Sequence, residues 1–120
     1  MKKMHLLLSL MSSLFLILSC SKGDSDTGNP NPPPATCTGP AKSFSSDVNP
    51  LIQSFCNKSG CHASGSTNGP GPLTNYSQVF SARAVIRNAV ATGLMPKDAT
   101  LTAAQKNAIV CWIDSGAPNN

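Results

Sequence analysis

The stretch FCNKSGCHASG at Phe55–Gly65 holds the residues on which the fold of this chain depends. Cys56 and Cys61 are separated by four residues, and His62 follows the second cysteine directly. Two thiols beside an imidazole serve three different chemistries. They form a covalent haem attachment site, close a small disulfide loop, or supply part of a zinc site. The rest of the sequence has to discriminate among these three.

The size of the chain gives this motif a structural role as well. The chain has 120 residues, which limits it to one small domain with appendages. Residues 37–120 are expected to form that domain, and a core of roughly 80 residues is thin without a covalent staple or a bound group. The motif offers either one.

Hydrophobic spacing predicts an all-α domain of three to four helices, since the sequence contains no convincing alternating strand pattern. A short first helix is expected to be capped by Ser46 or Asp47 and to run to the motif, with Pro50 tolerated in its first turn. A second helix is expected over 77–92, and whether Ser81 interrupts it is left open.

Helix-end signals mark the last third of the chain. Gly93 stands where a C′ glycine would follow the second helix. Thr102 and Gln105 have the spacing of a capping box, which predicts a last helix that runs to about Ser115. The apolar face of this helix is expected at Ala104, Ala108, Cys111 and Trp112.

Residues 1–19 have the pattern of an export signal. Two lysines precede an almost unbroken apolar run over 6–18, which is short for a membrane span. The sequence ILSC at 17–20 resembles a bacterial lipoprotein lipobox, although the leucine stands where a small residue is usual. The resemblance implies cleavage before Cys20 and lipidation of that residue, which would anchor the chain to a membrane. Simple secretion and a retained membrane helix are the alternatives.

Residues 20–36 are expected to be the lipidated cysteine and a disordered linker. The sequence SKGDSDTGNPNPPPAT at 21–36 is polar or rich in glycine and proline throughout, so it cannot bury a core. It would hold the domain away from the lipid surface. The expected location is the bacterial cell envelope, with the domain facing the periplasm or the cell surface.

The four remaining cysteines lie in the domain. An exported chain meets an oxidising compartment, in which cysteines are usually paired. Four cysteines allow three pairings, and the economical one joins Cys37 to Cys111 and leaves Cys56 and Cys61 to the motif. Free buried thiols at Cys37 and Cys111 are the alternative.

Covalent haem attachment accounts for the Cys61-His62 dipeptide. Two thiols form thioethers with the vinyl groups, and the adjacent imidazole ligates the iron, normally with two residues between the cysteines. A disulfide between Cys56 and Cys61 is the strongest rival. A zinc site is the weakest interpretation of the motif, because a structural zinc site needs four ligands and His62 is the single histidine left after cleavage.

Met95 is the single methionine left after removal of 1–19. It stands in GLMP at 93–96, after an expected helix end and before a proline. Methionine is the second axial ligand that raises the potential of a histidine-ligated haem. Filling a gap in the core is the ordinary role of a lone methionine, but its place in an irregular loop favours ligation.

From about Phe44 to Pro118 the chain resembles the class I cytochrome c family, in particular small monohaem domains on bacterial lipoproteins. The resemblance rests on the C-x4-C-H motif, on GPGPL at 69–73, on LMP at 94–96 and on the tryptophan of the last helix. It implies one covalent haem c, anchored by Cys56 and Cys61 and ligated by His62 and Met95. The four-residue spacing departs from the usual pattern of the family.

The resemblance also implies how the haem would be surrounded. A proline carbonyl, from Pro70 or Pro72, would hold the outer nitrogen of His62. Phe55 and Trp112 would pack where the first and last helices cross. The rest of the haem shell is expected to be apolar and to comprise Leu73, Tyr76, Phe80, Ile86, Val90 and Leu94.

The charge pattern and the polar residues exclude several functions. The chain has a net charge of +4, no glutamate and no basic block, so nucleic-acid binding is not expected. No acid/base pair, nucleophile constellation or phosphate loop supports enzymatic chemistry. Lys58 and Lys97 flank the two ligand segments and would steer an acidic redox partner, although solvated lysines are the simpler account.

The expected function is single-electron transfer between redox partner proteins by a membrane-tethered monohaem cytochrome. Protein ligands at both axial positions leave no open iron for a substrate, which favours a carrier over an enzyme. Two alternatives are a haem-free binding or scaffold lipoprotein with two disulfides, and a haem-based sensor in which Met95 is labile.

Overall fold

The computed structural model describes residues 36–120. The expected signal peptide 1–19, the lipidation site Cys20 and the linker up to residue 35 lie outside the described residues. Within 36–120 the chain is helical and contains no strand, as the all-α class predicts. No helix in this part of the chain is long and apolar enough to cross a membrane.

The first helical segment is continuous and is built from three short pieces: the π-helical η1 (Phe44–Val48), α1 (Asn49–Leu51) and the π-helical η2 (Ile52–Cys56). The prediction that Ser46 or Asp47 caps this segment is wrong. Ser43 is the cap, because its hydroxyl accepts from the Ser46 amide while the Asp47 carboxylate accepts from the Ser43 amide. This reciprocal pair starts the helix before Ser46.

The segment expected over 77–92 is two helices, α2 (Tyr76–Ser81) and α3 (Arg83–Ala91). Ala82 separates them, with φ −90° and ψ 0°. The Ser81 hydroxyl donates to a carbonyl in the preceding turn, which competes with regular helix continuation. After α3 the chain turns at Gly93 with φ +74°, as expected for a C′ glycine.

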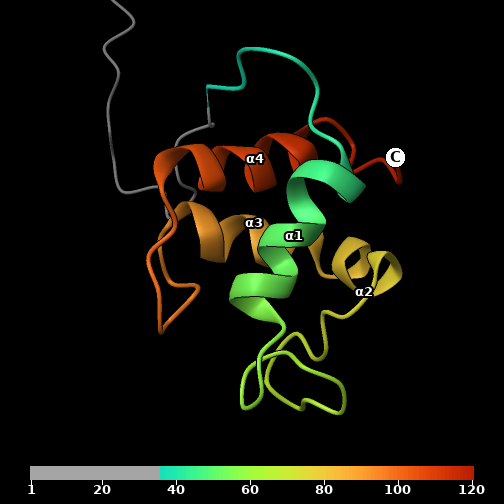
Figure 1. Cartoon of the computed structure of the whole chain (residues 1–120), viewed down its shortest axis with the longest axis vertical. Helices are drawn as coiled ribbons and strands as arrows, with labels where there is room; N and C mark the ends of the chain where they lie inside the picture. Colours follow the sequence, from blue (N-terminus) through green and yellow to red (C-terminus); the bar gives the residue numbers. More distant parts are fainter. Residues whose placement is uncertain (1–35) are drawn as a thin grey trace, which may run out of the picture.

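The last helix, α4 (Ala103–Asp114), packs beside α3, and the η1 end of the first segment packs against α4 (Figure 1). The capping box between Thr102 and Gln105 is present in both directions, as predicted. The expected apolar face is correct only in part, because Ala104 is exposed. The residues of α4 that are buried are Ala108, Ile109, Val110 and Trp112.

Trp112 is fully buried at the centre of an aromatic cluster. Its ring centroid lies 5.4 Å from that of Phe44 and 6.4 Å from that of Tyr76. The indole N–H donates to the Pro118 carbonyl over 2.9 Å. The aromatic partners of Trp112 are therefore Phe44 and Tyr76, whereas Phe55, the expected partner, lines the cavity described below.

Cys37 and Cys111 form a disulfide, with their Cα atoms 5.4 Å apart, as the economical pairing predicted. It ties the exposed segment before the first helix to α4. Asn120 ties the C-terminus to the start of the first helical segment, since it accepts hydrogen bonds from the amides of Phe44 and Ser45.

Candidate functional site

A cavity of about 520 Å³ lies between the motif loop, α3 and the segment that follows α3. A volume of this size is in the range of roughly 300–1,000 Å³ that holds a small molecule or cofactor. Most of its walls are apolar, and three of the predicted shell residues line it, namely Leu73, Ile86 and Val90.

The other three predicted shell residues lie elsewhere. Tyr76 packs in the aromatic cluster and donates its hydroxyl to the Ala117 carbonyl. The ring of Phe80 packs against Tyr76 and carries the Arg83 guanidinium 4.0 Å above its centroid. Leu94 points into solvent and is 69% exposed. Helical spacing could not reveal the places of Tyr76 and Phe80, because the helix breaks at Ala82, between α2 and α3. Leu94 follows α3 in a loop, where helical spacing does not apply.

The motif places both thiols and the imidazole at one end of the cavity. Cys56 is the last residue of η2, and the His62 amide donates to the Cys56 carbonyl over 3.1 Å. Within the spacer, the Cys61 amide donates to the Lys58 carbonyl, and Gly60 adopts φ +78°. The four-residue spacer is therefore a tight turn that brings His62 back against Cys56.

A polar clamp that the sequence did not reveal holds this turn. The Asn68 side-chain amide donates to the carbonyls of Gly60 and Cys61, over 2.9 and 3.2 Å. The Ser66 hydroxyl also donates to the Cys61 carbonyl. Asparagine and serine in a glycine-rich loop are common turn residues, so no pattern marked these two in advance.

The His62 ring is 7% exposed and has a defined orientation. Its Nδ1 lies 2.9 Å from the Gly71 carbonyl oxygen, which only accepts, so Nδ1 carries the proton. In the neutral imidazole with this tautomer, Nε2 carries no proton and is the nitrogen able to ligate a metal. The expected proline carbonyl, from Pro70 or Pro72, is wrong, since the glycine between them supplies the acceptor.

Local backbone geometry explains this change of acceptor. Gly71 has φ +98°, a conformation that side chains with a Cβ rarely adopt. The Leu73 amide donates to the His62 carbonyl over 2.8 Å, which holds the loop alongside the histidine. The loop therefore presents a glycine carbonyl to the ring.

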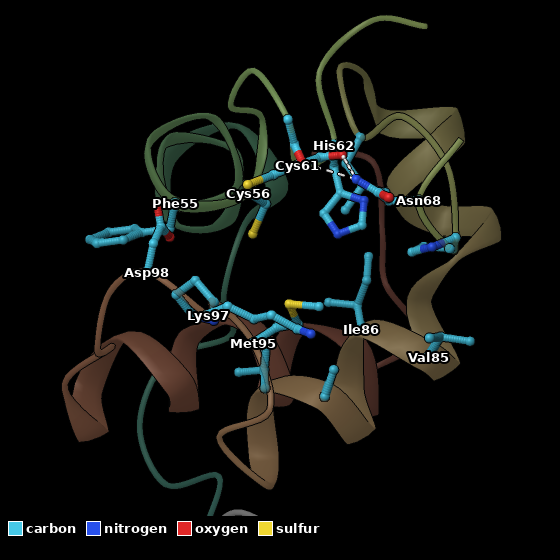
Figure 2. A pocket seen from close by; sticks show the side chains of 17 residues that line it. Phe55, Cys56, Cys61, His62, Asn68, Val85, Ile86, Met95, Lys97 and Asp98 are labelled. Atoms are coloured by element: carbon cyan, nitrogen blue, oxygen red, sulfur yellow. Dashed lines mark hydrogen bonds between the residues drawn. The ribbon is translucent and has the colours of Figure 1, made fainter. Parts of the chain in front are cut away.

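Met95 lies on the opposite wall of the cavity. Its amide donates to the Ala89 carbonyl near the end of α3, over 3.1 Å. Figure 2 shows the side chains of Met95 and His62 facing each other across the pocket, with the thiols of Cys56 and Cys61 together at one side. The four residues predicted as cofactor ligands thus meet at one cavity.

Cys56 and Cys61 are both free thiols, so the second disulfide of the haem-free alternative is not formed. Burial, and secondarily the neighbouring Cys61, raises the pKa of the Cys56 thiol to about 11. At neutral pH Cys56 is therefore a protonated thiol in an apolar wall. The two other cysteines of residues 36–120, Cys37 and Cys111, are paired with each other.

Charged residues lie at one rim of the cavity. Lys58, in the spacer, forms an ion pair with Asp98, with Nζ and Oδ2 3.1 Å apart. The hydrogen bond from Lys58 holds the pKa of the Asp98 carboxyl below its usual value. Lys97 also lines the cavity. Of the two lysines expected to steer a partner, Lys58 is thus already neutralised.

The arrangement of these residues differs from that of a structural zinc site. Between residues 36 and 120 no three His, Cys, Asp or Glu side chains converge as they would on a metal ion, whereas a structural zinc site needs four ligands. Histidine and methionine are residue types that hold haem iron in proteins, and thiols are the groups that attach a c-type haem covalently. Residues of these types line one cavity here, so they are the ones that would hold such a group.

Comparisons with protein-family models, with curated proteins and with solved structures give no match for this chain. Function is therefore inferred from the residues of the site.

Proposed function

We propose that this chain is a monohaem c-type cytochrome that carries single electrons between redox partner proteins, tethered to a membrane of the bacterial cell envelope through Cys20. One observation carries the proposal: His62, with Nδ1 tied to the Gly71 carbonyl, faces Met95 across an apolar cavity flanked by two unpaired thiols.

Each of these residues has a distinct task at the site. Cys56 and Cys61 provide the thiols that would anchor the group covalently. The hydrogen bond to Gly71 orients the ring of His62 with Nδ1 as the donor, so that Nε2 would be the atom that holds the iron. Met95 closes the opposite wall. A haem held here supplies an iron that takes up and releases one electron.

The apolar walls favour electron transfer over substrate chemistry. Leu73, Ile86 and Val90 line the cavity and are each at most 6% exposed, so apolar side chains form much of its wall. A dry environment helps to set the redox potential of a bound haem. With an imidazole and a thioether on the two walls, no position is reserved for a substrate, and a carrier is the function that these residues support best.

The deciding experiment is expression of the full chain in a bacterial periplasm that contains cytochrome maturation factors. We expect colour that resists acid–acetone extraction, a pyridine haemochrome spectrum of the c type, and a mass increased by one haem. A colourless protein that has lost four protons by disulfide formation would contradict the proposal and favour the scaffold alternative.

The role of Met95 separates a carrier from a sensor. In the ferrous protein with Met95 intact, we expect little carbon monoxide binding, and Met95→Ala should bind it readily. Leu94→Ala is the matched control, because Leu94 precedes Met95 but is 69% exposed. Ready carbon monoxide binding by the unmutated protein would instead identify a sensor with a labile methionine.

The membrane tether is tested separately. Metabolic labelling with a radioactive fatty acid should mark the unmutated protein and leave Cys20→Ser unlabelled. Fractionation should place the labelled protein with membranes and Cys20→Ser in the soluble periplasm. Equal labelling of both proteins would remove the lipid anchor from the proposal without affecting the haem site.

A further inference from the structure

The four-residue spacer of the motif reaches across the cavity rim to the segment that carries Met95. Lys58 Nζ and Asp98 Oδ2 are 3.1 Å apart, although the two residues are 40 positions apart in the chain. Lys58 lies between the two motif cysteines, and Asp98 lies three residues after Met95. The ion pair therefore joins the wall that bears His62 to the wall that bears Met95.

We propose that Lys58 and Asp98 form a latch that holds the Met95 segment closed against the motif loop. Both are positioning residues, because neither is offered as a ligand and each acts through the segment that it holds. The assignment to the distal ligand rests on the proposed function. The latch itself is a property of the polypeptide and is testable without a haem.

The lysine side of the latch is held firmly by the backbone. The Lys58 amide donates to the Cys56 carbonyl, and the Lys58 carbonyl accepts from the amides of Cys61 and Ala63. Three backbone hydrogen bonds thus fix the residue at the centre of the spacer turn. A side chain that extends from a fixed turn is able to restrain what it binds.

The aspartate side has few other restraints. Within the described residues, 96–101 make no hydrogen bond to another residue except the one between Asp98 and Lys58. The segment is anchored before this stretch by the Met95 amide, which donates to the Ala89 carbonyl, and at its end by Leu101, which is 3% exposed. The latch is therefore the polar restraint in the middle of the segment.

The charge and exposure of the two side chains agree with a latch. Among residues 36–120, Asp98 is the one acidic residue that lines the cavity, and Lys58 forms an ion pair with it. The two side chains keep 38% and 52% exposure, so the interaction is one that salt and substitution modulate rather than a buried structural pair. A modest and reversible restraint on Met95 is the expected consequence.

Two readouts test the latch in the full chain. Hydrogen exchange of the Met95 amide reports opening of the segment, with or without haem. Cyanide affinity of the ferric haem-loaded protein reports how easily Met95 is displaced. We expect Asp98→Asn and Lys58→Met each to raise both quantities two- to fivefold at low salt, the range of an exposed ion pair. In 1 M salt the difference from the unmutated protein should shrink.

A charge swap and a matched control make the test specific. Lys58→Asp with Asp98→Lys should return both quantities to within twofold of the unmutated protein, whereas either reversal alone should not. Asp114→Asn removes the other ion pair, in which Arg87 of α3 holds Asp114 through two hydrogen bonds of 2.6 and 2.9 Å. Since neither of these residues lines the cavity, this control should leave both readouts unchanged.

The outcomes separate the two proposals. A coloured protein in which Asp98→Asn leaves exchange and cyanide affinity unchanged overturns the latch and spares the cytochrome proposal. A colourless protein overturns the cytochrome proposal, and exchange at the Met95 amide still decides whether the latch exists. Equal effects of Asp98→Asn and Asp114→Asn on exchange and cyanide affinity would also overturn the latch, because they would reflect general destabilisation of the domain.

Discussion

The disulfide between Cys37 and Cys111 should contribute a large share of the stability of this domain. Its partners are separated by 74 residues, so it closes almost the whole domain into one loop. In the chain-entropy account, a loop of this length restricts the unfolded chain by about 4.5 kcal/mol at 25 °C. A domain of roughly 85 residues has a free energy of unfolding of about 4–13 kcal/mol.

The structure suggests that removing the disulfide should cost slightly less than this loop-closure value of about 4.5 kcal/mol. Residues 36–41 are exposed, and once the disulfide is gone they can fray while the helices stay packed. Fraying returns some conformational entropy to the native state, which offsets part of the loss. We therefore expect Cys37→Ser with Cys111→Ser to lower the free energy of unfolding by about 3–4.5 kcal/mol, when the same amount of haem is bound.

Urea denaturation followed by circular dichroism measures this loss. With a slope of about 1–1.5 kcal/mol per molar urea, typical of a small domain, the midpoint should fall by about 2–4.5 M. Dithiothreitol should produce the same fall in the unmutated protein and none in the double variant, because thioethers are not reduced. A fall below about 1 kcal/mol, or a further effect of dithiothreitol on the double variant, would refute the reasoning.

Three other changes have definite expected outcomes. Trp112→Ala should lower the free energy of unfolding by about 3–5 kcal/mol in urea, because the indole is fully buried, whereas Trp112→Phe should cost less; a loss under 1 kcal/mol for Trp112→Ala would contradict the packing described. Gly71→Ala should lower the free energy of unfolding by about 1–2 kcal/mol, because φ +98° strains any residue with a Cβ. Gly69→Ala is the control, because Gly69 does not have a positive φ, and it should be nearly neutral. In the haem-free chain the folded pKa of the Cys56 thiol, about 11, lies above its ordinary value of 9.0, so the free energy of unfolding should fall as the pH rises from 9 to 11. Cys56→Ala should remove that fall. The haem-loaded protein should not show it either, because it has no Cys56 thiol to titrate.

Local signals in the sequence predicted several elements correctly. The capping box at Thr102 and Gln105 and the turn at Gly93 depend on a few neighbouring residues, so their chemistry is complete within one short stretch. The start of the first helix was placed too late. Ser43 and Asp47 form a reciprocal cap in the structure, but Ser46 offered an equally good cap in the sequence.

Contacts between distant segments were predicted only where a residue type left few choices. Four domain cysteines allow only three pairings, and the structure has the pairing of Cys37 with Cys111. His62 and Met95 were singled out because each is the single residue of its kind in the expected mature chain, and both line the cavity. Three of the six residues expected around the haem do not line the cavity: Tyr76 and Phe80 pack against each other on α2, which ends at the break at Ala82, and Leu94 is exposed after α3.

The sequence by itself therefore determined the helical class, the disulfide and the identity of the candidate ligands, because these depend on residue type and on local spacing. The tertiary structure alone decided which carbonyl holds His62, which side chains line the cavity, that Asn68 clamps the motif turn, and that Lys58 meets Asp98. Each of those contacts depends on loop conformations, in which a glycine with positive φ or a single turn directs a group several ångströms away, and no periodic pattern in the sequence encodes that direction.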